Sequence, residues 1–256
     1  AAVGTPSVFG DLTELAAVDD PDRRPQANGL KIDRQGRLIA ADAGAGRLLR
    51  IAADGSRVEV LADRFDGVRF NAINDVALDR EGNIYFSDPG GSSAENPVGS
   101  IYRYDARTTA VSRLDTGLAF PNGLGVTPDE KFLCLAESQK FRLLIYDLAA
   151  DGTVSGRREL IRFPDRTEGN IIGGEFDPDG LVFDAQGRLY VGMWIGGVIN
   201  VVEVPTGKLL RQYNAGGEQA TNCHFYGDYL YTTIAAKQAV FRLKLNVRGY
   251  DYAGSE

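Results

Sequence analysis

The stretch FPNGLGVTPDEKFLCLAES, residues 120–138, places Asn122 between a proline and a glycine, directly before an apolar run. Taken alone, a Pro-Asn-Gly triplet predicts a turn, because each of its residues favours turn backbone conformations. An isolated turn would not be expected to carry the same surroundings elsewhere in the chain. The surroundings of Asn122 do recur, and this repetition predicts the fold.

Four further stretches repeat the pattern. They read ANGLKIDRQGRLIAAD from Ala27, INDVALDREGNIYFSD from Ile73, PDGLVFDAQGRLYVGM from Pro178 and TNCHFYGDYLYTTI from Thr221. Each stretch has Asn or Asp at its second position, followed by a short run of alternating apolar residues. These polar residues are Asn28, Asn74, Asn122, Asp179 and Asn222. The next turn in each copy is expected at Gly36, Gly82, Glu130, Gly187 and Gly227.

Each repeat continues with a third strand-like segment, such as RLLRI from Arg47, and most continue with a fourth, such as VEVLAD from Val58. The segments alternate with a period of two, and no long amphipathic helical pattern is present. Four short strands per repeat, with repeats 43 to 57 residues apart, are typical of a β-propeller. We therefore predict an all-β chain that forms a single propeller domain over residues 1–256, built of four-stranded blades. Five repeats are recognisable, and residues 1–27 form a partial or atypical first blade.

The composition is that of a folded, acidic protein. Of the 256 residues, 43% are hydrophobic and 25% are charged, and the net charge is −7. An acidic surface repels phosphate backbones, so we expect no nucleic-acid partner. We also expect no membrane partner, because no apolar run approaches the roughly 20 residues of a membrane helix.

The two cysteines lack metal-ligand spacing and are expected to be buried thiols. The chain starts with Ala-Ala and no methionine, which predicts a processed N-terminus and leaves cytoplasmic and periplasmic or secreted locations open.

In a propeller the first strand of every blade lines the central channel, so equivalent residues of successive blades form a ring. The Asn and Asp side chains of the repeats are therefore expected to face one mouth of the channel. Amide and carboxylate oxygens are costly to bury without a partner, and oxygen ligands suit Ca²⁺ or Mg²⁺. The same residue types also form turns, so a structural role is the alternative, above all for Asn28 and Asn222.

These stretches resemble the gluconolactonase-like family, which includes senescence marker protein (regucalcin), luciferin-regenerating enzyme and diisopropyl fluorophosphatase. The resemblance is carried by ANGLKIDRQGRLIAAD, RFDGVRFNAINDVALDREGNIYFSDP, residues 120–138 and PDGLVFDAQGRLYVGMW, in the family's order. It implies a six-bladed propeller with a divalent cation in the channel, most often Ca²⁺, with Mg²⁺, Mn²⁺ or Zn²⁺ as alternatives. It also implies hydrolysis of a small-molecule lactone or related ester.

The resemblance implies, by position, that Asn74, Asn122 and Asp179 belong to the metal site. Asp179, the only carboxylate in the predicted ring, is the implied catalytic base or nucleophile, and a base here would take a proton from metal-bound water. The single histidine, His224, matches a histidine that some family members place near the metal. It is a second catalytic candidate, and a core residue is the alternative. The candidate substrate-binding residues are Asn28, Asn71, Glu175 and Trp194.

One family feature is missing, namely the Glu-Gly-Pro motif that supplies a fourth metal ligand and opens the family's first blade. Glu175, four residues before Asp179, is the candidate substitute. Within residues 1–27, only PSVFGDL at residues 6–12 reads as a strand. The ring is expected either to close through that strand in the last blade, to keep an incomplete blade, or to build a sixth blade from segments such as VRGYDYAGSE at residues 247–256. An unclosed ring exposes strand edges, so a monomer or an edge-paired homodimer is expected.

The sequence therefore predicts a lactonase- or esterase-type hydrolase in which a divalent cation in the channel activates water. Two alternatives stay open. One is a metal-free propeller of the strictosidine-synthase-like type, which carries out condensation or isomerisation chemistry. The other is a non-catalytic propeller that binds a small molecule or a protein. The insert FPDRTEGNIIGGEFD, residues 163–177, is expected to form a lid.

Overall fold

A computed structural model of the chain describes residues 8–18, 20–163 and 177–252. In this part of the chain five antiparallel sheets follow one another, four with four strands and the last with three. The first two sheets comprise β1 (Ala27–Ile32), β2 (Leu38–Asp42), β3 (Arg47–Ile51) and β4 (Val58–Ala62), then β7 (Val76–Leu78), β8 (Ile84–Asp88), β9 (Gly99–Tyr104) and β10 (Val111–Leu118). The third comprises β11 (Pro121–Val126), β12 (Phe132–Glu137), β13 (Arg142–Leu148) and β14 (Val154–Arg162). The last two comprise β15 (Pro178–Phe183), β16 (Leu189–Met193), β17 (Val198–Val202) and β18 (Leu209–Asn214), then β19 (Ala220–Tyr226), β20 (Tyr229–Ile234) and β21 (Ala239–Lys244).

The remaining elements are short. They are α1 (Leu12–Leu15), the hairpin of β5 (Arg64–Phe65) and β6 (Val68–Arg69), and the 3₁₀ turns η1 (Ser138–Lys140) and η2 (Ala235–Lys237). No helix in the described ranges has the length and apolar character needed to cross a membrane.

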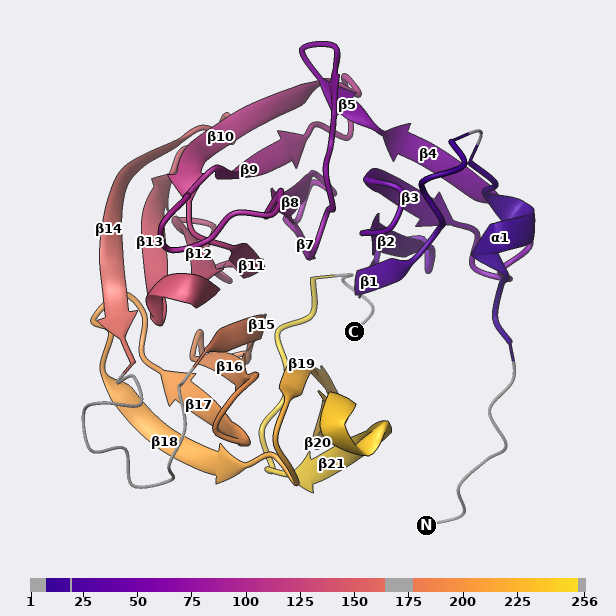
Figure 1. The fold of residues 1–256 in the computed structure, drawn as a ribbon. Helices are drawn as coiled ribbons and strands as arrows, with labels where there is room; N and C mark the ends of the chain where they lie inside the picture. The colour runs from indigo at the N-terminus through magenta and orange to yellow at the C-terminus, as the bar shows by residue number, and fades with distance from the viewer. Residues whose placement is uncertain (1–7, 19, 164–176, 253–256) are drawn as a thin grey trace.

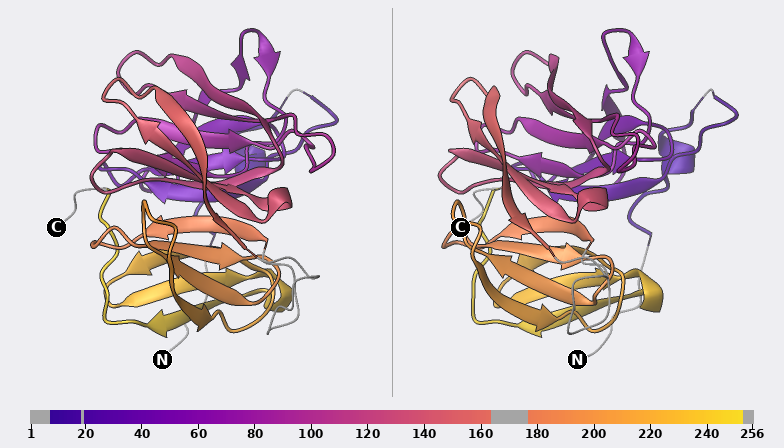
Figure 2. Two further views of the ribbon diagram at one scale, coloured as in Figure 1. Left: turned by 90° about the vertical axis from the view of Figure 1, so that its left-hand side faces the viewer. Right: turned by 60° about the vertical axis from the view of Figure 1, so that its left-hand side comes forward.

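The five sheets surround a common centre like the blades of a propeller (Figure 1). The first strand of each blade lies innermost: β1, β7, β11, β15 and β19. Side views show successive sheets stacked against one another through their faces (Figure 2). These features confirm the predicted all-β propeller with five recognisable blades. Among the described residues no further sheet lies between the first blade and the last (Figure 1).

Four hydrophobic clusters fill the spaces between successive blades. The strand β12, FLCLAE, shows how one strand serves two of them. Leu133 and Leu135 enter the cluster shared with the preceding blade, whereas Cys134 and Ala136 enter the cluster shared with the following blade. Alternate side chains of a strand point to opposite faces, so a strand buried on both faces reads as a continuous apolar run. Each fully buried leucine contributes about 1.5–3 kcal/mol to folding. Both cysteines are buried free thiols, as predicted.

The turns predicted after each inner strand are confirmed. All five residues have the positive φ of left-handed turn geometry: Gly36 73°, Gly82 84°, Glu130 57°, Gly187 78° and Gly227 54°. Four of the five positions are glycine, which adopts this geometry without the steric cost that a side chain brings.

The Pro-Asn-Gly triplet, in contrast, does not form a turn. It opens β11, in which Pro121 pairs with Glu137 and Leu124 pairs with Leu135. Between these two pairs, β11 has two residues, Asn122 and Gly123, whereas β12 has only one. The strand β11 therefore contains one extra residue here, which is a β-bulge. The turn prediction for this triplet was wrong because a bulge favours the same small and polar residues as a turn.

The two ends of the described chain do not complete the ring. Of the strand predicted at residues 6–12, the described part lacks strand structure, and α1 begins at Leu12. Leu12 packs against Ala40 and Leu49, on the face of the first blade that is turned away from the second blade. The last sheet contains only β19, β20 and β21, so closure through an N-terminal strand is not observed among the described residues.

The C-terminal stretch also builds no blade in the part that is described. Gly249 forms one isolated bridge with Asp184. The amide of Tyr250 donates to the carbonyl of Phe183 at 3.0 Å, and the hydroxyl of Tyr252 donates to the carbonyl of Val126 at 3.0 Å. This segment therefore ties the end of the last blade to the fourth and third blades.

Candidate active site

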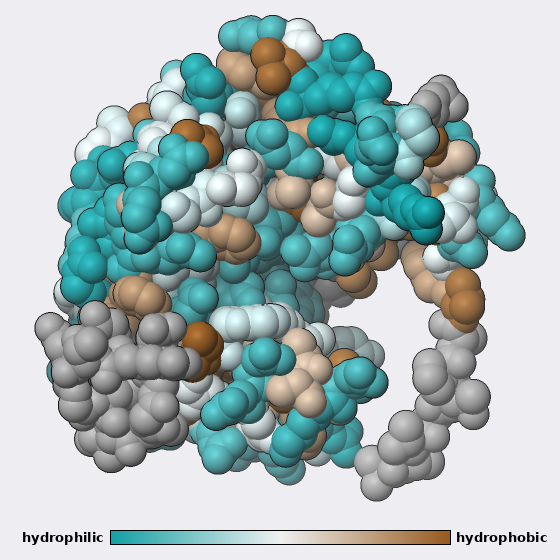
Figure 3. All heavy atoms as spheres, in the orientation of Figure 1, coloured by the Kyte–Doolittle hydropathy of each residue, from teal (hydrophilic) through white to brown (hydrophobic). Residues whose placement is uncertain are grey.

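The central channel contains a cavity of about 560 Å³. The space-filling view shows the molecule hollowed at its centre, with the hollow open on the side between the first and last blades (Figure 3). All five residues of the predicted ring line the cavity, namely Asn28, Asn74, Asn122, Asp179 and Asn222. The structure thus brings side chains from five different blades to one space, although 194 residues of sequence separate the first from the last.

Bulges aim most of these side chains. In β1, β11 and β15 the register shifts at the start of the strand, beside Asn28, Asn122 and Asp179, and in β19 it shifts between Ala220 and Asn222. A bulge bends its strand and redirects a side chain, and bulges are enriched beside active sites. The repeated Asn or Asp is therefore the residue that the bulge turns toward the channel.

The glycine that follows the polar residue allows neighbouring inner strands to approach closely. A Cβ atom on Gly123 would lie 2.2 Å from the carbonyl oxygen of Asp179 and 2.8 Å from the Cα of Gly180. A Cβ on Gly180 would lie 2.4 Å from the side chain of Asn222. These contacts are shorter than packed atoms tolerate, so glycine is required at both positions. The close approach brings the polar side chains of successive blades together.

Two neighbouring carboxylates act on Asp179 at this end of the cavity. Burial raises the pKa of Asp179 well above its ordinary value, and the charges of Asp75 and Asp177 raise it further, while a hydrogen bond with Asn122 opposes the shift. Burial also raises the pKa of Asp75 to about 6, against the opposing charge of Lys31. Asp179 is the only carboxylate of the ring, as predicted, but it is not the only one in the cavity, because Asp177 lines it too.

The other predicted site residues are placed as follows. His224 lies on the cavity wall with its side chain accessible to solvent, so it is not a core residue. The protein around the channel nevertheless removes part of the water that would solvate a charged ring, and this desolvation and, to a smaller extent, the charge of Lys31 lower its pKa to about 4, which leaves the ring neutral at pH 7. Trp194 lines the cavity. Asn71 does not, and its amide instead donates to the Asp88 carboxylate at 2.9 Å. Glu175, like most of the insert before Asp179, lies outside the described residues.

A set of carboxylates outside the predicted ring holds the segments that lead into it. Each ends the second strand of its blade and accepts backbone N–H groups two or three residues before the ring asparagine. Asp42 accepts from Gln26 at 2.7 Å, and Glu137 accepts from Ala119 at 2.9 Å. Asp88 accepts from Asn71 and Ala72 at 2.9 and 3.0 Å. The sequence carried a signal for this, because LIAAD, IYFSD and FLCLAE all end in an acid.

Ser138 connects the third and fourth blades at the cavity. It is 2% exposed, and its hydroxyl donates to the carbonyl of Pro178 at 2.6 Å. Its amide donates to the carbonyl of Phe120 at 3.1 Å. The residues that precede Asn122 and Asp179 by two and one positions are thus bonded to the same serine, which fixes the two strand starts relative to each other.

Glu137→Ala is expected to lower the free energy of unfolding by about 3 kcal/mol or more. The substitution leaves the buried Ala119 amide without its acceptor and Arg142 without a carboxylate 2.6 Å away. Urea unfolding would measure the loss. The matched control is Glu159→Ala, because Glu159 also pairs with Arg142, at 3.2 Å, but is half-exposed. The control is expected to cost about 0–1 kcal/mol. Equal losses in both variants would contradict the anchoring role of Glu137.

The donor set at the acidic end of the cavity fits a hard divalent cation. It offers amide oxygens and a carboxylate that is held near two others, an arrangement whose like-charge repulsion a cation would relieve. Within the described residues, no cluster of three or more His, Cys, Asp or Glu side chains is arranged to bind a metal. A cation here would therefore depend on the asparagines, which favours Ca²⁺ or Mg²⁺ over softer metals.

The fold and the site define a β-propeller whose channel is lined by polar side chains from the inner strands of separate blades. The chain belongs to the SMP-30/gluconolactonase/LRE-like family, whose profile matches residues 10–236.

Several relatives carry lactonase names. A gluconolactonase of Zymomonas mobilis is 28% identical over 89% of this chain and 65% of its own length. The pentonolactonase XacC of Haloferax volcanii is 30% identical over 87% of this chain and 72% of its own length. A solved gluconolactonase from Xanthomonas campestris superposes with a TM-score of 0.71 at 26% identity, over 88% of this chain and 72% of that one. The chain therefore spans 65–72% of the length of these three relatives.

Proposed function

We propose that this protein is a divalent-cation-dependent hydrolase of lactones or related esters, with Ca²⁺ as the favoured ion. The observation that carries the proposal is the convergence of Asn74, Asn122 and Asp179 on one cavity. The lactonase names of the relatives support the choice of reaction. A cavity of about 560 Å³ is also within the range of small-molecule sites.

Asn74, Asn122 and Asp179 would hold the cation, which when bound would supply polarisation of the ester carbonyl and a water of lowered pKa. Asp179 is the residue that accepts the proton of the attacking water. Its hydrogen bond with Asn122 orients the carboxylate for this task. Trp194, on the cavity wall, supplies an apolar surface against the substrate ring.

The proposal is tested by lactone hydrolysis before and after metal removal. Treatment with a chelator is expected to reduce the hydrolysis of glucono-δ-lactone to the uncatalysed background, and added Ca²⁺ is expected to restore it. Chelator saturated with Ca²⁺ beforehand is the control. Proton release measured at constant pH follows the reaction.

The other outcomes distinguish the alternatives. Full activity in the metal-free protein would support a metal-free propeller instead. No hydrolysis of any lactone, with or without a cation, would support a propeller that only binds its ligand.

A further inference from the structure

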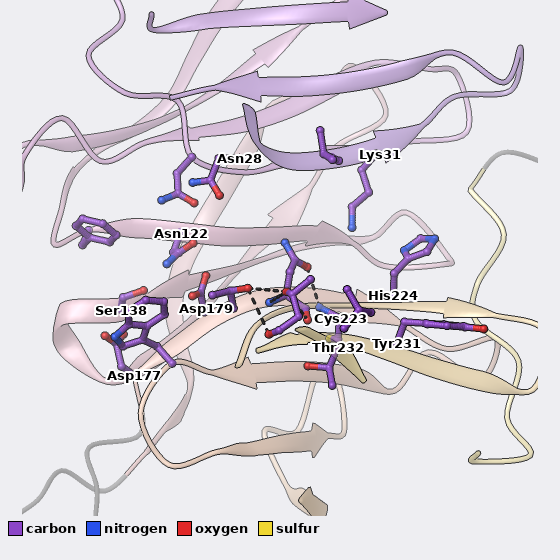
Figure 4. A pocket seen from close by; sticks show the side chains of 18 of the residues that line it. Asn28, Lys31, Asn122, Ser138, Asp177, Asp179, Cys223, His224, Tyr231 and Thr232 are labelled. Atoms are coloured by element: carbon purple, nitrogen blue, oxygen red, sulfur yellow. Dashed lines mark hydrogen bonds between the residues drawn. The ribbon is translucent and has the colours of Figure 1, made fainter. Parts of the chain in front are cut away.

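The cavity has two chemically different ends. Figure 4 shows Asn122, Ser138, Asp177 and Asp179 at one end, where the acidic groups gather. At the other end it shows Lys31, which reaches from β1 into the space in front of the last blade. His224 and Tyr231 also lie toward that end (Figure 4), and the only carboxylates among the described residues of the cavity wall are Asp177 and Asp179.

Lys31 is the only lysine or arginine among the described residues of the cavity wall. Its ammonium forms no hydrogen bond or ion pair within the described ranges. Arginines elsewhere in the protein, such as Arg47 and Arg142, do pair with carboxylates. The charge of Lys31 nevertheless acts on Asp75 in the second blade and on Cys223 and His224 in the last blade. Lys31 lines the cavity, and Figure 4 shows its side chain reaching into the space beside His224.

The neighbours of Lys31 leave its charge available to a ligand. His224 is neutral at pH 7 because its pKa is about 4, so it adds no second charge but keeps a ring N–H. Asp75 is buried beneath the cavity wall and is not part of its lining. An ammonium in a partly enclosed site, beside neutral donors, is a typical partner of a carboxylate or phosphate group.

We propose that Lys31 binds an anionic substituent of the substrate, so that the preferred substrates are sugar lactones that carry a carboxylate or a phosphate away from the ester. This inference rests on the proposed function, because it assumes that the lactone ring lies at the Asp179 end of the same cavity. The two ends then select for two features of one molecule, the ester at the acidic end and the anion at the basic end.

A purely structural role for Lys31 makes a different prediction. If the ammonium serves only to balance the buried charge of Asp75, its removal disturbs the whole channel. The Michaelis constants of neutral and anionic lactones would then change together. Anion binding changes the Michaelis constant of the anionic lactone alone.

The test compares three lactones, namely neutral glucono-δ-lactone, its 6-phosphate and a carboxylated glucarolactone. Lys31→Met is expected to raise KM for the charged lactones about 10- to 100-fold, which is the range for loss of a hydrogen bond to a charged group. KM for the neutral lactone is expected to stay within about twofold. Lys31→Arg is expected to retain the preference, and Lys208→Met, at an exposed lysine, to change neither constant. The charged lactone whose KM rises more in Lys31→Met identifies whether phosphate or carboxylate is the preferred anion.

A parallel binding measurement separates this inference from the proposed function. Calorimetric titration with neutral glucitol and with glucitol 6-phosphate needs no turnover. Tighter binding of the phosphate by the unmodified protein, lost in Lys31→Met, supports the inference even if no lactone is hydrolysed. Equal affinity for glucitol and glucitol 6-phosphate overturns it, and so does an equal change of KM for neutral and charged lactones. A urea unfolding midpoint unchanged from that of the unmodified protein would establish that Lys31→Met is folded.

Discussion

Asp179→Asn is expected to reduce lactone hydrolysis by roughly 10²–10⁴-fold, the share that general-base catalysis usually supplies. The amide keeps the shape of the side chain but cannot take a proton from water. It also removes the one carboxylate among the three proposed metal ligands, so weaker Ca²⁺ binding is expected as well. Initial rates at saturating Ca²⁺, together with a Ca²⁺ titration, would separate the two effects.

The same variant is expected to be more stable than the unmodified protein when a chelator is present. The pKa of Asp179 is raised, so the folded state favours the protonated acid and is destabilised as the pH rises above the ordinary aspartate value. Each unit of elevation corresponds to about 1.4 kcal/mol. Thermal unfolding at pH 8 in chelator would show a higher midpoint for Asp179→Asn. The control Asp151→Asn removes an exposed aspartate and is expected to keep full activity. A less stable Asp179→Asn protein would contradict the charge cluster described here.

The strands and turns could be predicted from the sequence because local physical rules determine them. Alternating apolar residues mark strands, and the glycines at positions 36, 82 and 187 mark left-handed turns. The ring of polar residues could be predicted as well, because repeats with one geometry place equivalent residues at equivalent sites. The repetition carries this information, and Asn122 alone would not have done so.

The remaining features depend on contacts between distant segments. Asp177 lies two residues before Asp179 in the sequence, but Asp75 comes near Asp179 only because the second and fourth blades meet at the channel, and no local pattern shows this. Lys31 faces the cavity for the same reason. Residues 6–12 resemble a strand by composition, but the described part has no neighbouring strand to pair with. It packs instead on the first blade through Leu12, the first residue of α1. Pairing partners, and not propensity, decide such cases.

Gly123→Ala is expected to destabilise the protein by about 3 kcal/mol and to abolish most of its activity. The added methyl group would lie 2.2 Å from the carbonyl oxygen of Asp179, a backbone atom that can move only if β15 moves. Moving β15 separates Asp179 from Asn122, so stability and site geometry are lost together. Urea unfolding and initial rates measure the two losses, and a Ca²⁺ titration is expected to show weakened binding.

Gly82→Ala is the matched control for this prediction. Gly82 has a φ of 84°, so alanine there is strained and is expected to cost about 1 kcal/mol. No atom beyond its chain neighbours lies within 4 Å of its added methyl group, and Gly82 is not part of the cavity lining. The control should therefore lose some stability but retain Ca²⁺ affinity and turnover. If Gly123→Ala behaves like Gly82→Ala, then close approach of β11 and β15 is not what holds Asn122 and Asp179 together. The glycines that follow Asn122 and Asp179 would then reflect backbone conformation alone.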